Sequence, residues 1–327
     1  MIGLIRKCWH FPMNYIVFDL EWNQCPYGKH REVKGLPFEI IEIGAVKLNS
    51  DREIVDQFHR VVRPVVYPTL HYRTREIVHM DKATLQNGVH FKQAIREFLS
   101  WCGSDSFFCT WGSIDLVELQ RNMKYYHCLN LMKGPLHYYD VQKLFAISYE
   151  TMKSRRSLEY GIDYLHLDKN LDFHRALSDA MYTALIFQMI DMDVVLAYDS
   201  IDVYQNPKQK KDEIHAVYNG YTKFISREFA NKEEAMMDRE VAATHCCLCG
   251  KNSRKKLRWF SVNAKNYYCV AMCPTHGYMK GKIRMKRTDE GKIYAVKTIK
   301  VSSEMEAFEI RQKKELLREK RRKKRHE

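Results

Sequence analysis

Two acidic residues end an apolar run near the start of the chain. The segment "YIVFDLEWNQ" (15–24) passes through Ile, Val and Phe before it reaches Asp19 and Glu21, two positions apart. Side chains at i and i+2 of a strand point to the same side, so both carboxylates would face one side of a sheet. Because such a close pair repels itself unless a cation lies between, the spacing indicates a site for a hard divalent cation such as Mg²⁺ or Mn²⁺.

Two further acids and a histidine stand at the ends of other elements. "FCTWGSIDLVELQ" is an apolar strand, a tight turn and a helix with Asp115 in its first turn, and "FHRALSDAMYTALI" places His174 five residues before Asp179. Taken singly, each acid is equally well explained as a helix N-terminal residue stabilised by the helix dipole, and His174 as a loop residue. The joint order D-x-E, then D, then H-x-x-x-x-D is much harder to obtain by chance and indicates one shared site.

Four carboxylates and one histidine suit the hydrolysis of a phosphodiester. Two divalent metals about 3.5–4 Å apart can activate an attacking water and stabilise the leaving oxygen. Histidine is the side-chain type that ordinarily titrates near neutral pH, so His174 is the candidate to take the proton of the water. The chain contains neither a G-x-x-x-x-G-K loop nor a G-x-S-x-G elbow, which would indicate a competing chemistry.

A cysteine cluster indicates a second metal site of another kind. "HCCLCGKN" and "MCPTHGY" each contain a pair of ligands separated by two residues and followed by glycine. The four ligands are Cys246, Cys249, Cys273 and His276. This pattern predicts a closed, structural Zn²⁺ ribbon, in which Cys247 or Cys269 could replace a named member; ordinary reduced thiols are the alternative. Basic and aromatic residues interleave around the cluster, as is typical of proteins that bind single-stranded nucleic acid.

The basic residues are concentrated in the C-terminal part of the 327-residue chain. Residues 1–200 hold 23 Lys or Arg against 24 Asp or Glu, and residues 201–327 hold 31 against 16, so the net charges are −1 and +15. The asymmetry predicts a neutral catalytic part joined to a part that binds a polyanion, the alternative being a solvated charged surface.

The sequence shows neither a membrane span nor a signal peptide, and the scattered cysteines outside the cluster suit a reducing compartment. We therefore expect a cytoplasmic protein without membrane partners, with translation starting at Met1 or Met13.

Hydrophobic patterns predict the elements that carry these motifs. β-Branched and apolar runs predict strands over 15–20, 39–48, 53–62 and 106–111, and helical periodicity predicts helices over 91–102, 157–165 and 176–190. Along the chain, strands come first and are followed by strands that alternate with helices. This order predicts an α/β fold with a mixed sheet flanked by helices. The C-terminal part is expected to add a small β module around the zinc ribbon.

The three acidic motifs together resemble those of the DEDDh 3′–5′ exonucleases of the ribonuclease-H-like fold, and most of all the ERI-type exoribonucleases. "VFDLEWN", "TWGSIDLVELQRN" and "FHRALSDAMYTA" match the three family motifs, and "EIIEIGAVKL" and "YYDVQKLF" are also similar to that branch, within residues 13–195. The resemblance implies two Mg²⁺ or Mn²⁺ ions held by Asp19, Glu21, Asp115 and Asp179, with His174 as general base. Trp22 departs from the small or hydroxyl residue of many relatives; it either stacks on a terminal base or is a core aromatic.

The expected activity is metal-dependent 3′–5′ removal of nucleoside monophosphates from single-stranded nucleic acid, with RNA favoured over DNA. The predicted division is an exonuclease domain over 13–197, a linker or partly helical connector over 198–240, a basic zinc ribbon over 241–302 and a basic helical or disordered tail over 303–327. Two alternatives stay open: a DNA-directed exonuclease of the same fold, and a non-catalytic nucleic-acid-binding regulator or scaffold.

Overall fold

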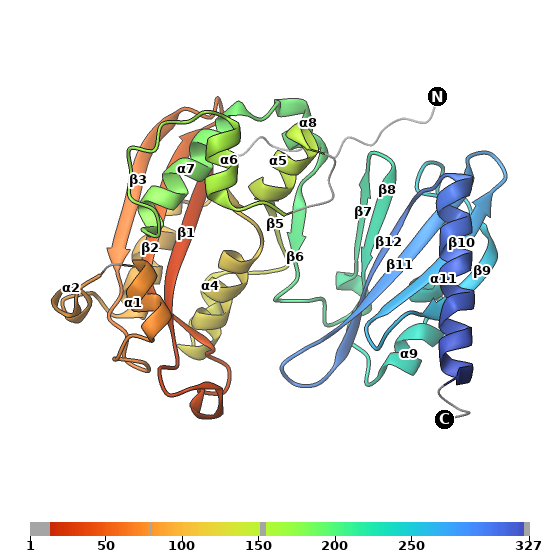
Figure 1. Ribbon diagram of the computed structural model, residues 1–327, viewed down its shortest axis with the longest axis horizontal. Helices are drawn as coiled ribbons and strands as arrows, with labels where there is room; N and C mark the ends of the chain where they lie inside the picture. Colours follow the sequence, from red (N-terminus) through yellow and green to blue (C-terminus); the bar gives the residue numbers. More distant parts are fainter. Residues whose placement is uncertain (1–13, 79, 151–154, 324–327) are drawn as a thin grey trace. The chain divides into compact units, whose positions relative to one another are not determined.

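The computed structural model of the chain describes residues 14–78, 80–150 and 155–323, and Figure 1 shows its elements. The chain divides between Tyr204 and Gln205 into two compact units. The choice between Met1 and Met13 as the first residue lies outside the described residues, as do the last four residues of the basic tail.

The N-terminal unit is built on a six-stranded mixed sheet with the strand order β3-β2-β1-β4-β5-β6. The strands are β1 (Asn14–Gln24), β2 (Phe38–Asn49), β3 (Ile54–Val61), β4 (Ser106–Thr110), β5 (Leu136–Asp140) and β6 (Ser200–Asp202). The first three pair antiparallel, β1, β4 and β5 run parallel, and β6 is antiparallel to β5. This sheet confirms the predicted fold class.

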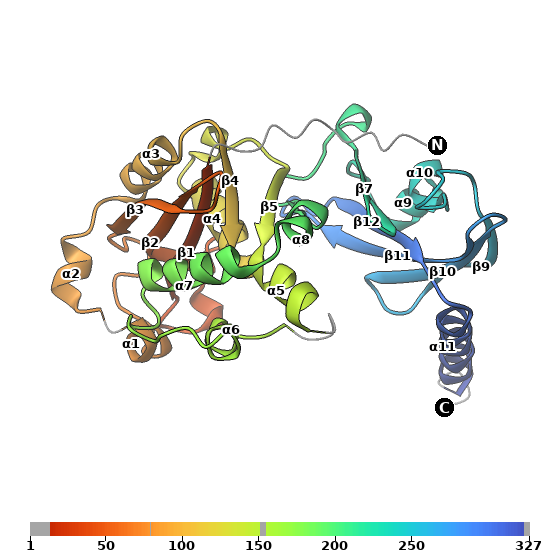
Figure 2. The same ribbon diagram turned by 90° about the horizontal axis from the view of Figure 1, so that it is seen from above.

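Helices cover both faces of this sheet, as Figure 2 shows. One face packs against α3 (Phe91–Cys102) and α4 (Ile114–Tyr125), and the other packs against α5 (Val141–Tyr149), α6 (Leu158–Tyr164) and α7 (Ala176–Met189). The shorter helices are η1 (Lys29–Arg31), α1 (Tyr72–Val78), α2 (Lys82–Gln86), η2 (Leu129–Leu131) and α8 (Met192–Ala197). Alternation along β1 explains the two cores, because Ile16 and Phe18 face α3 while Tyr15 and Val17 face α7.

A glycine in β2 sets how closely α7 approaches the sheet. A Cβ atom added to Gly44 would lie 2.0 Å from the backbone N of Leu177 and 2.1 Å from the carbonyl carbon of Ala176. Any larger residue would therefore push the first turn of α7 away from the sheet. Gly44 pairs directly with Asp19 of β1, so the start of α7 lies over the middle of β1.

The C-terminal unit contains a second six-stranded sheet, antiparallel throughout its described pairs, with the order β7-β8-β12-β11-β10-β9. Its strands are β7 (Ile214–Tyr218), β8 (Tyr221–Ile225), β9 (Arg254–Ser261), β10 (Asn266–Cys273), β11 (Gly277–Arg287) and β12 (Ile293–Val301). Its helices are η3 (Lys210–Asp212), α9 (Lys232–Met237), α10 (Arg239–Ala242) and α11 (Glu304–Lys323). A core beneath α9 and α10 includes Phe224, Ile283 and Ala295.

The structure divides the predicted connector, residues 198–240, differently from the sequence analysis. Its first residues form β6 of the first sheet, and residues 214–225 form the β7–β8 hairpin of the second sheet, where we expected partial helix. The turn is Asn219–Gly220, with φ of 80° at the glycine, which is the dipeptide that two-residue hairpins favour. The stretch thus belongs to both sheets, and its helical parts are η3, α9 and the start of α10.

The C-terminal tail forms one helix over most of its length. α11 carries two acidic residues in its first turn and four basic residues in its last turn, a distribution that complements the helix dipole. Within the described ranges, none of the helices combines the length and the apolar character of a bilayer span.

Candidate active site and cysteine cluster

Strand pairing brings the first three predicted acids together just beyond the carboxyl end of β4. β4 runs parallel to β1 and ends beside its middle, and α4 follows β4 closely, so the first turn of α4 lies beside the second half of β1. Between the two acids of β1, the backbone N–H of Leu20 donates a hydrogen bond to the carboxylate of Asp115. Asp19 and Glu21 therefore flank the strand residue to which Asp115 is bonded.

The segment leading into α7 supplies the remaining two residues. Ligating atoms of Glu21, His174 and Asp179 all lie within 4.8 Å of one another. The backbone N–H of His174 donates to Oδ2 of Asp179 at 3.2 Å, and His174 adopts a left-handed backbone conformation with φ of 61°. Such a conformation is uncommon for a residue with a side chain, and strained residues of this kind cluster at functional sites. The imidazole is exposed, whereas Asp179 is buried.

The acids oppose one another's ionisation. Burial, followed by repulsion from neighbouring carboxylates, raises the pKa of Glu21 to about 8 and that of Asp19 well above its usual range. Burial also raises the pKa of Asp115 to about 7 and that of Asp179 to about 6, although backbone N–H donors lower both. A group of acids with such raised pKa values is poised to ionise fully once cations lie among them.

One carboxylate oxygen in this group has no hydrogen-bond partner within the described part of the chain. Oδ1 of Asp179 is buried and unpaired, while Oδ2 accepts from His174. Buried polar atoms without a partner are rare in native proteins, because each costs about 1–3 kcal/mol. A divalent cation would provide the missing partner, so this donor set fits hard metal ions.

Sequence reasoning missed a fifth carboxylate, Glu42 of β2, which pairs with Glu21 across the strands and is fully buried. It accepts from Nη2 of Arg175 at 3.0 Å and from the backbone N–H of Ala176, the first residue of α7, at 3.2 Å, and it lies 2.6 Å from Nε2 of His59. Burial opposes its ionisation, but these hydrogen bonds lower the pKa of Glu42 below its usual value. Glu42 thus anchors the start of α7 in the sheet.

Trp22 follows a β-bulge that lies between it and Glu21. Its ring is half-buried, packs on the face that α3 and α4 cover, and lies 5.6 Å from the ring of Phe38 between centroids. Trp22 is therefore an aromatic residue at the border of the hydrophobic core. A role in stacking on a terminal base stays a prediction.

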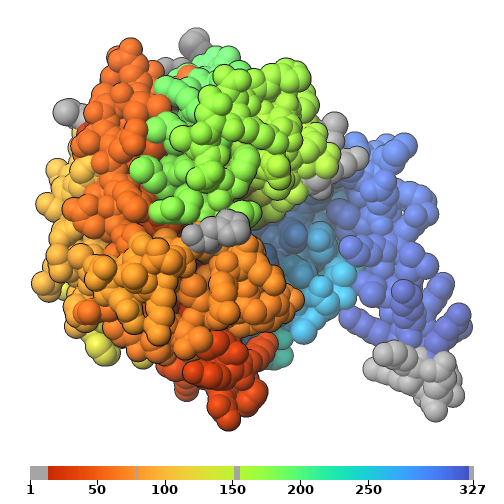
Figure 3. Space-filling view, turned by 60° about the vertical axis from the view of Figure 1, so that its left-hand side comes forward, coloured from red at the N-terminus to blue at the C-terminus, as the bar shows by residue number. Residues whose placement is uncertain are grey.

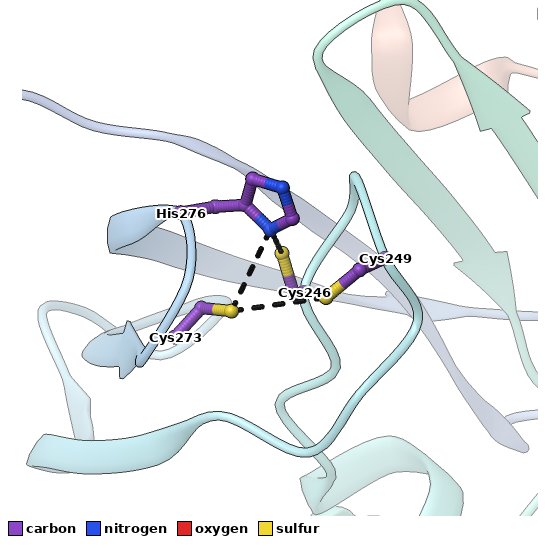
Figure 4. Close-up of side chains that lie close together, drawn as sticks. All are labelled: Cys246, Cys249, Cys273 and His276. Carbon is purple, nitrogen blue, oxygen red and sulfur yellow. Dashed lines mark hydrogen bonds between the residues drawn. The ribbon is translucent and has the colours of Figure 1, made fainter. Parts of the chain in front are cut away.

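The predicted zinc ligands lie together in the C-terminal unit, as Figure 4 shows. Their ligating atoms all lie within 4.8 Å of one another. Sγ of Cys246 is 3.5 Å from Nδ1 of His276, and Sγ of Cys273 is 3.7 Å both from that nitrogen and from Sγ of Cys249. The other two cysteines point elsewhere: Sγ of Cys247 contacts Gly220 and Met279, and Sγ of Cys269 lies against Gly281.

Backbone N–H groups point at the sulfurs of the cluster. Cys246 accepts from the N–H groups of residues 248 and 249, and Cys273 accepts from those of residues 275 and 276. Burial opposes ionisation of Cys273, but these donors lower the pKa of its thiol to about 6. The glycine that follows each pair is left-handed, with φ of 70° at Gly250 and 75° at Gly277, which lets the turn fold back on the sulfurs. The donor set fits a tetrahedral Zn²⁺ ion.

Comparison with known proteins decides the family of the N-terminal unit. The profile of the Exonuclease family, RNase_T, matches residues 16–187, more than half of the chain. The chain belongs to this exonuclease family. The probable 3′–5′ exonuclease KapD of Bacillus subtilis (strain 168) is 27% identical over 188 residues, which cover 54% of this chain and 84% of KapD. These findings confirm the predicted enzyme class, a 3′–5′ exonuclease.

Other relatives match a similar share of this exonuclease. A PolC-type DNA polymerase III of Staphylococcus saprophyticus is 23% identical over 176 residues, covering 53% of this chain but only 11% of the polymerase. The crystal structure of the nuclease domain of 3′hExo, a DEDDh family member bound to rAMP, superposes with a TM-score of 0.50 at 18% identity. It covers 58% of this chain and 98% of that domain, and it shows that the fold is shared.

Proposed function

We propose that the protein removes nucleoside monophosphates one at a time from the 3′ end of single-stranded nucleic acid, with RNA favoured over DNA. The observation that carries this proposal is the meeting of Glu21, His174 and Asp179 within 4.8 Å, beside the carboxylates of Asp19 and Asp115. Membership of the exonuclease family agrees with it. The preference for RNA is supported by the resemblance to the ERI-type exoribonucleases.

The four acids would hold two Mg²⁺ or Mn²⁺ ions. When bound, such ions activate water and neutralise the charge that develops on the phosphate and on the leaving oxygen. The acids supply up to four negative charges, which balance two divalent cations. The unpaired Oδ1 of Asp179 and the raised pKa of Glu21 are the features that cation binding would relieve. β1 and the first turns of α4 and α7 hold these ligands rigidly.

His174 is the proposed general base. Its imidazole accepts the proton of the water that attacks the terminal phosphorus, while the bond between that phosphorus and the 3′ oxygen of the preceding nucleotide breaks. The products are a nucleoside 5′-monophosphate and a strand shorter by one nucleotide. The exposed position of the imidazole lets it meet substrate, and its backbone bond to Asp179 keeps it beside the acids.

The cysteine cluster would hold a structural Zn²⁺ ion with Cys246, Cys249, Cys273 and His276 as ligands. Four protein ligands close the coordination sphere, so this ion would support folding and not chemistry. The surrounding unit carries the basic excess of the chain, so we propose that it clamps the substrate strand by its phosphates.

The test follows single strands of RNA and DNA of one sequence, labelled at the 5′ end, during incubation with the full chain and Mg²⁺. The proposal expects a ladder of products shortened from the 3′ end, release of nucleoside 5′-monophosphates, and faster trimming of RNA. Faster trimming of DNA would favour the DNA-directed alternative. Absence of metal-dependent release from either strand would favour the non-catalytic alternative.

A further inference from the structure

A basic and aromatic stretch borders the candidate active site within the N-terminal unit. Residues 59–75 contain four arginines, two histidines and two tyrosines but no acidic residue, although residues 1–200 as a whole are nearly neutral. α1 begins inside this stretch, and both ribbon views place it beside the start of α7 (Figures 1 and 2). The stretch therefore lies next to the segment that carries His174.

A buried glutamate holds the middle of this stretch in place. Glu39 of β2, 1% exposed, accepts hydrogen bonds from the backbone N–H groups of residues 65–67 at 2.6–3.0 Å. It also accepts from the hydroxyl of Tyr126 at 2.7 Å. Hydrogen bonds to a buried charged group contribute more than neutral ones, so this loop is fixed firmly on the sheet.

A buried asparagine ties the same stretch to the strand that carries the acids. Asn23 is fully buried and stands two residues after Glu21. Its amide donates to the carbonyl oxygens of Tyr67 and Thr69 at 2.8 and 2.9 Å, and its oxygen accepts from the N–H of His71 at 2.9 Å. The position of α1 is therefore set directly by the end of β1.

Tyr67 connects a second basic loop, which includes residues 27–34, to the stretch that Glu39 and Asn23 hold in place. Its hydroxyl accepts from the N–H of Val33 and donates to the carbonyl oxygen of Leu36, both at 2.8 Å. The loop places the guanidinium of Arg31 5.8 Å from the ring centroid of Tyr27, which is 58% exposed. Figure 3 shows this loop, in red, against the orange segment that contains α1, with the green segment that leads into α7 directly above.

The side chains presented by this framework suit a nucleotide. Tyr72 is 58% exposed, its ring centroid lies 4.5 Å from that of His71, and its hydroxyl accepts from Nε of Arg73 at 3.0 Å. Arg73 and Arg31 are exposed as well. Exposed rings next to cations that can track phosphates are how proteins hold single strands without reading their sequence.

We propose that this rim, residues 27–34 and 71–75, binds the nucleotides immediately 5′ of the scissile phosphate. Tyr72 stacks on a base, and Arg31 and Arg73 face the phosphates of the same strand. The inference rests on the proposed 3′–5′ exonuclease function and adds a strand-binding surface inside the catalytic unit, separate from the basic C-terminal unit. It gives the substrate one direction of approach to Glu21, His174 and Asp179.

Kinetics of the full chain test the rim. For a strand of about ten nucleotides, we expect Tyr72→Leu and Arg73→Gln each to raise KM roughly tenfold, with kcat changed less than about twofold. Tyr72→Phe keeps the ring and should keep the wild-type KM. Arg96→Gln, an exposed arginine on α3 on the other face of the sheet, is the matched control and should change neither constant. An unchanged KM in both Tyr72→Leu and Arg73→Gln would overturn the proposal that the rim binds the strand.

A second measurement does not depend on turnover. A strand with a photoreactive base next to its 3′-terminal nucleotide is cross-linked to the Asp179→Asn protein, and the labelled peptides are identified. We expect labelling within residues 27–34 or 71–75. Labelling confined to other segments would contradict the proposal that the rim binds the strand. If the wild-type chain releases no nucleotide, the proposed function fails, and the cross-linking result still decides whether the rim binds a strand.

Discussion

The acids of β1, α4 and α7 oppose ionisation in the absence of cations, and this has a consequence for stability. For Glu21, Asp115 and Asp179 the pKa in the folded, metal-free protein is raised, to about 8, 7 and 6. The folded chain therefore binds more protons than the unfolded chain between about pH 4 and 8. The contribution of these groups to stability is fully present below about pH 4 and is lost as the pH rises through the raised values.

Metal binding should reverse this loss. We expect Mg²⁺ to raise Tm substantially at about pH 8 and much less at about pH 5, where protons compete with the cation for the same oxygens. Thermal melts at both pH values, with and without Mg²⁺, check this. An equal shift at both pH values would show that the cation binds elsewhere, and Asp179→Asn should reduce the shift at the higher pH.

His174 should contribute to rate and not to metal binding. We expect His174→Ala to lower kcat by roughly 100- to 10,000-fold, the range for loss of a general base, while Mg²⁺ still raises Tm as in wild type. His166→Ala is the matched control, because His166 is likewise left-handed, with φ of 53°, and lies outside the described metal-ligand group. Single-turnover rates measure the effect, and a His174→Ala rate within about threefold of wild type would remove the residue from the chemistry.

At the scale of elements, several strands and helices of the N-terminal unit could be predicted from apolar runs bounded by polar or turn residues, although β2 and α7 are buried on most sides and show no clear apolar period. β1, α3 and α7 start within one residue of the predicted positions. The partnership of Glu42 and Arg175 could not be predicted, because it depends on how closely α7 approaches β2 over Gly44. Glu39 and Glu42, two acids inside an otherwise apolar run, were the available signal that buried carboxylates have specific partners there.

The β7–β8 hairpin was missed for a different reason. Its strands alternate only weakly, with exposed His215 and Val217 next to half-buried neighbours, so periodicity gave little indication. The Asn219–Gly220 turn was the stronger signal. β8 acquires its partner, β12, from residues some seventy positions later, and that pairing is a tertiary contact that local pattern does not contain.

The cysteine cluster supports a prediction that distinguishes two cysteines standing two positions apart. We expect Cys249→Ser to lose one equivalent of tightly bound Zn²⁺ and to destabilise the C-terminal unit, since folding of small metal sites is coupled to the metal. Cys247→Ser should retain zinc, because Sγ of Cys247 points to Gly220 and Met279. Elemental analysis of freshly purified variants measures their zinc content. Bound zinc in Cys249→Ser, or no bound zinc in Cys247→Ser, would show a different ligand set.

At the scale of the whole molecule, the basic charge lies in the part of the chain without the candidate catalytic residues. Residues 201–327 carry a net charge of +15, and the last turn of α11 presents Lys320, Arg322 and Lys323 to solvent. If this unit clamps the strand, affinity should fall with salt because phosphate contacts release counterions.

Neutralising that last turn tests the clamp. The triple replacement of Lys320, Arg322 and Lys323 by glutamine should weaken binding at low salt and reduce the slope of log affinity against log salt by about 0.7 per lost phosphate contact. kcat should not change. Lys92→Gln with Arg96→Gln on α3 is the control. An unaltered salt slope in the α11 variant would assign this helix to another partner.

The central claim, that the acids of β1 and of the first turns of α4 and α7 perform the hydrolysis, is tested most directly by one comparison. Asp179→Asn is measured against Asp168→Asn, an exposed aspartate in the loop before α7, on a 5′-labelled single strand with Mg²⁺. The account predicts that Asp168→Asn trims from the 3′ end like wild type, and that Asp179→Asn, with an unchanged circular dichroism spectrum, releases no nucleoside monophosphate above background. Near-wild-type release by Asp179→Asn would contradict it.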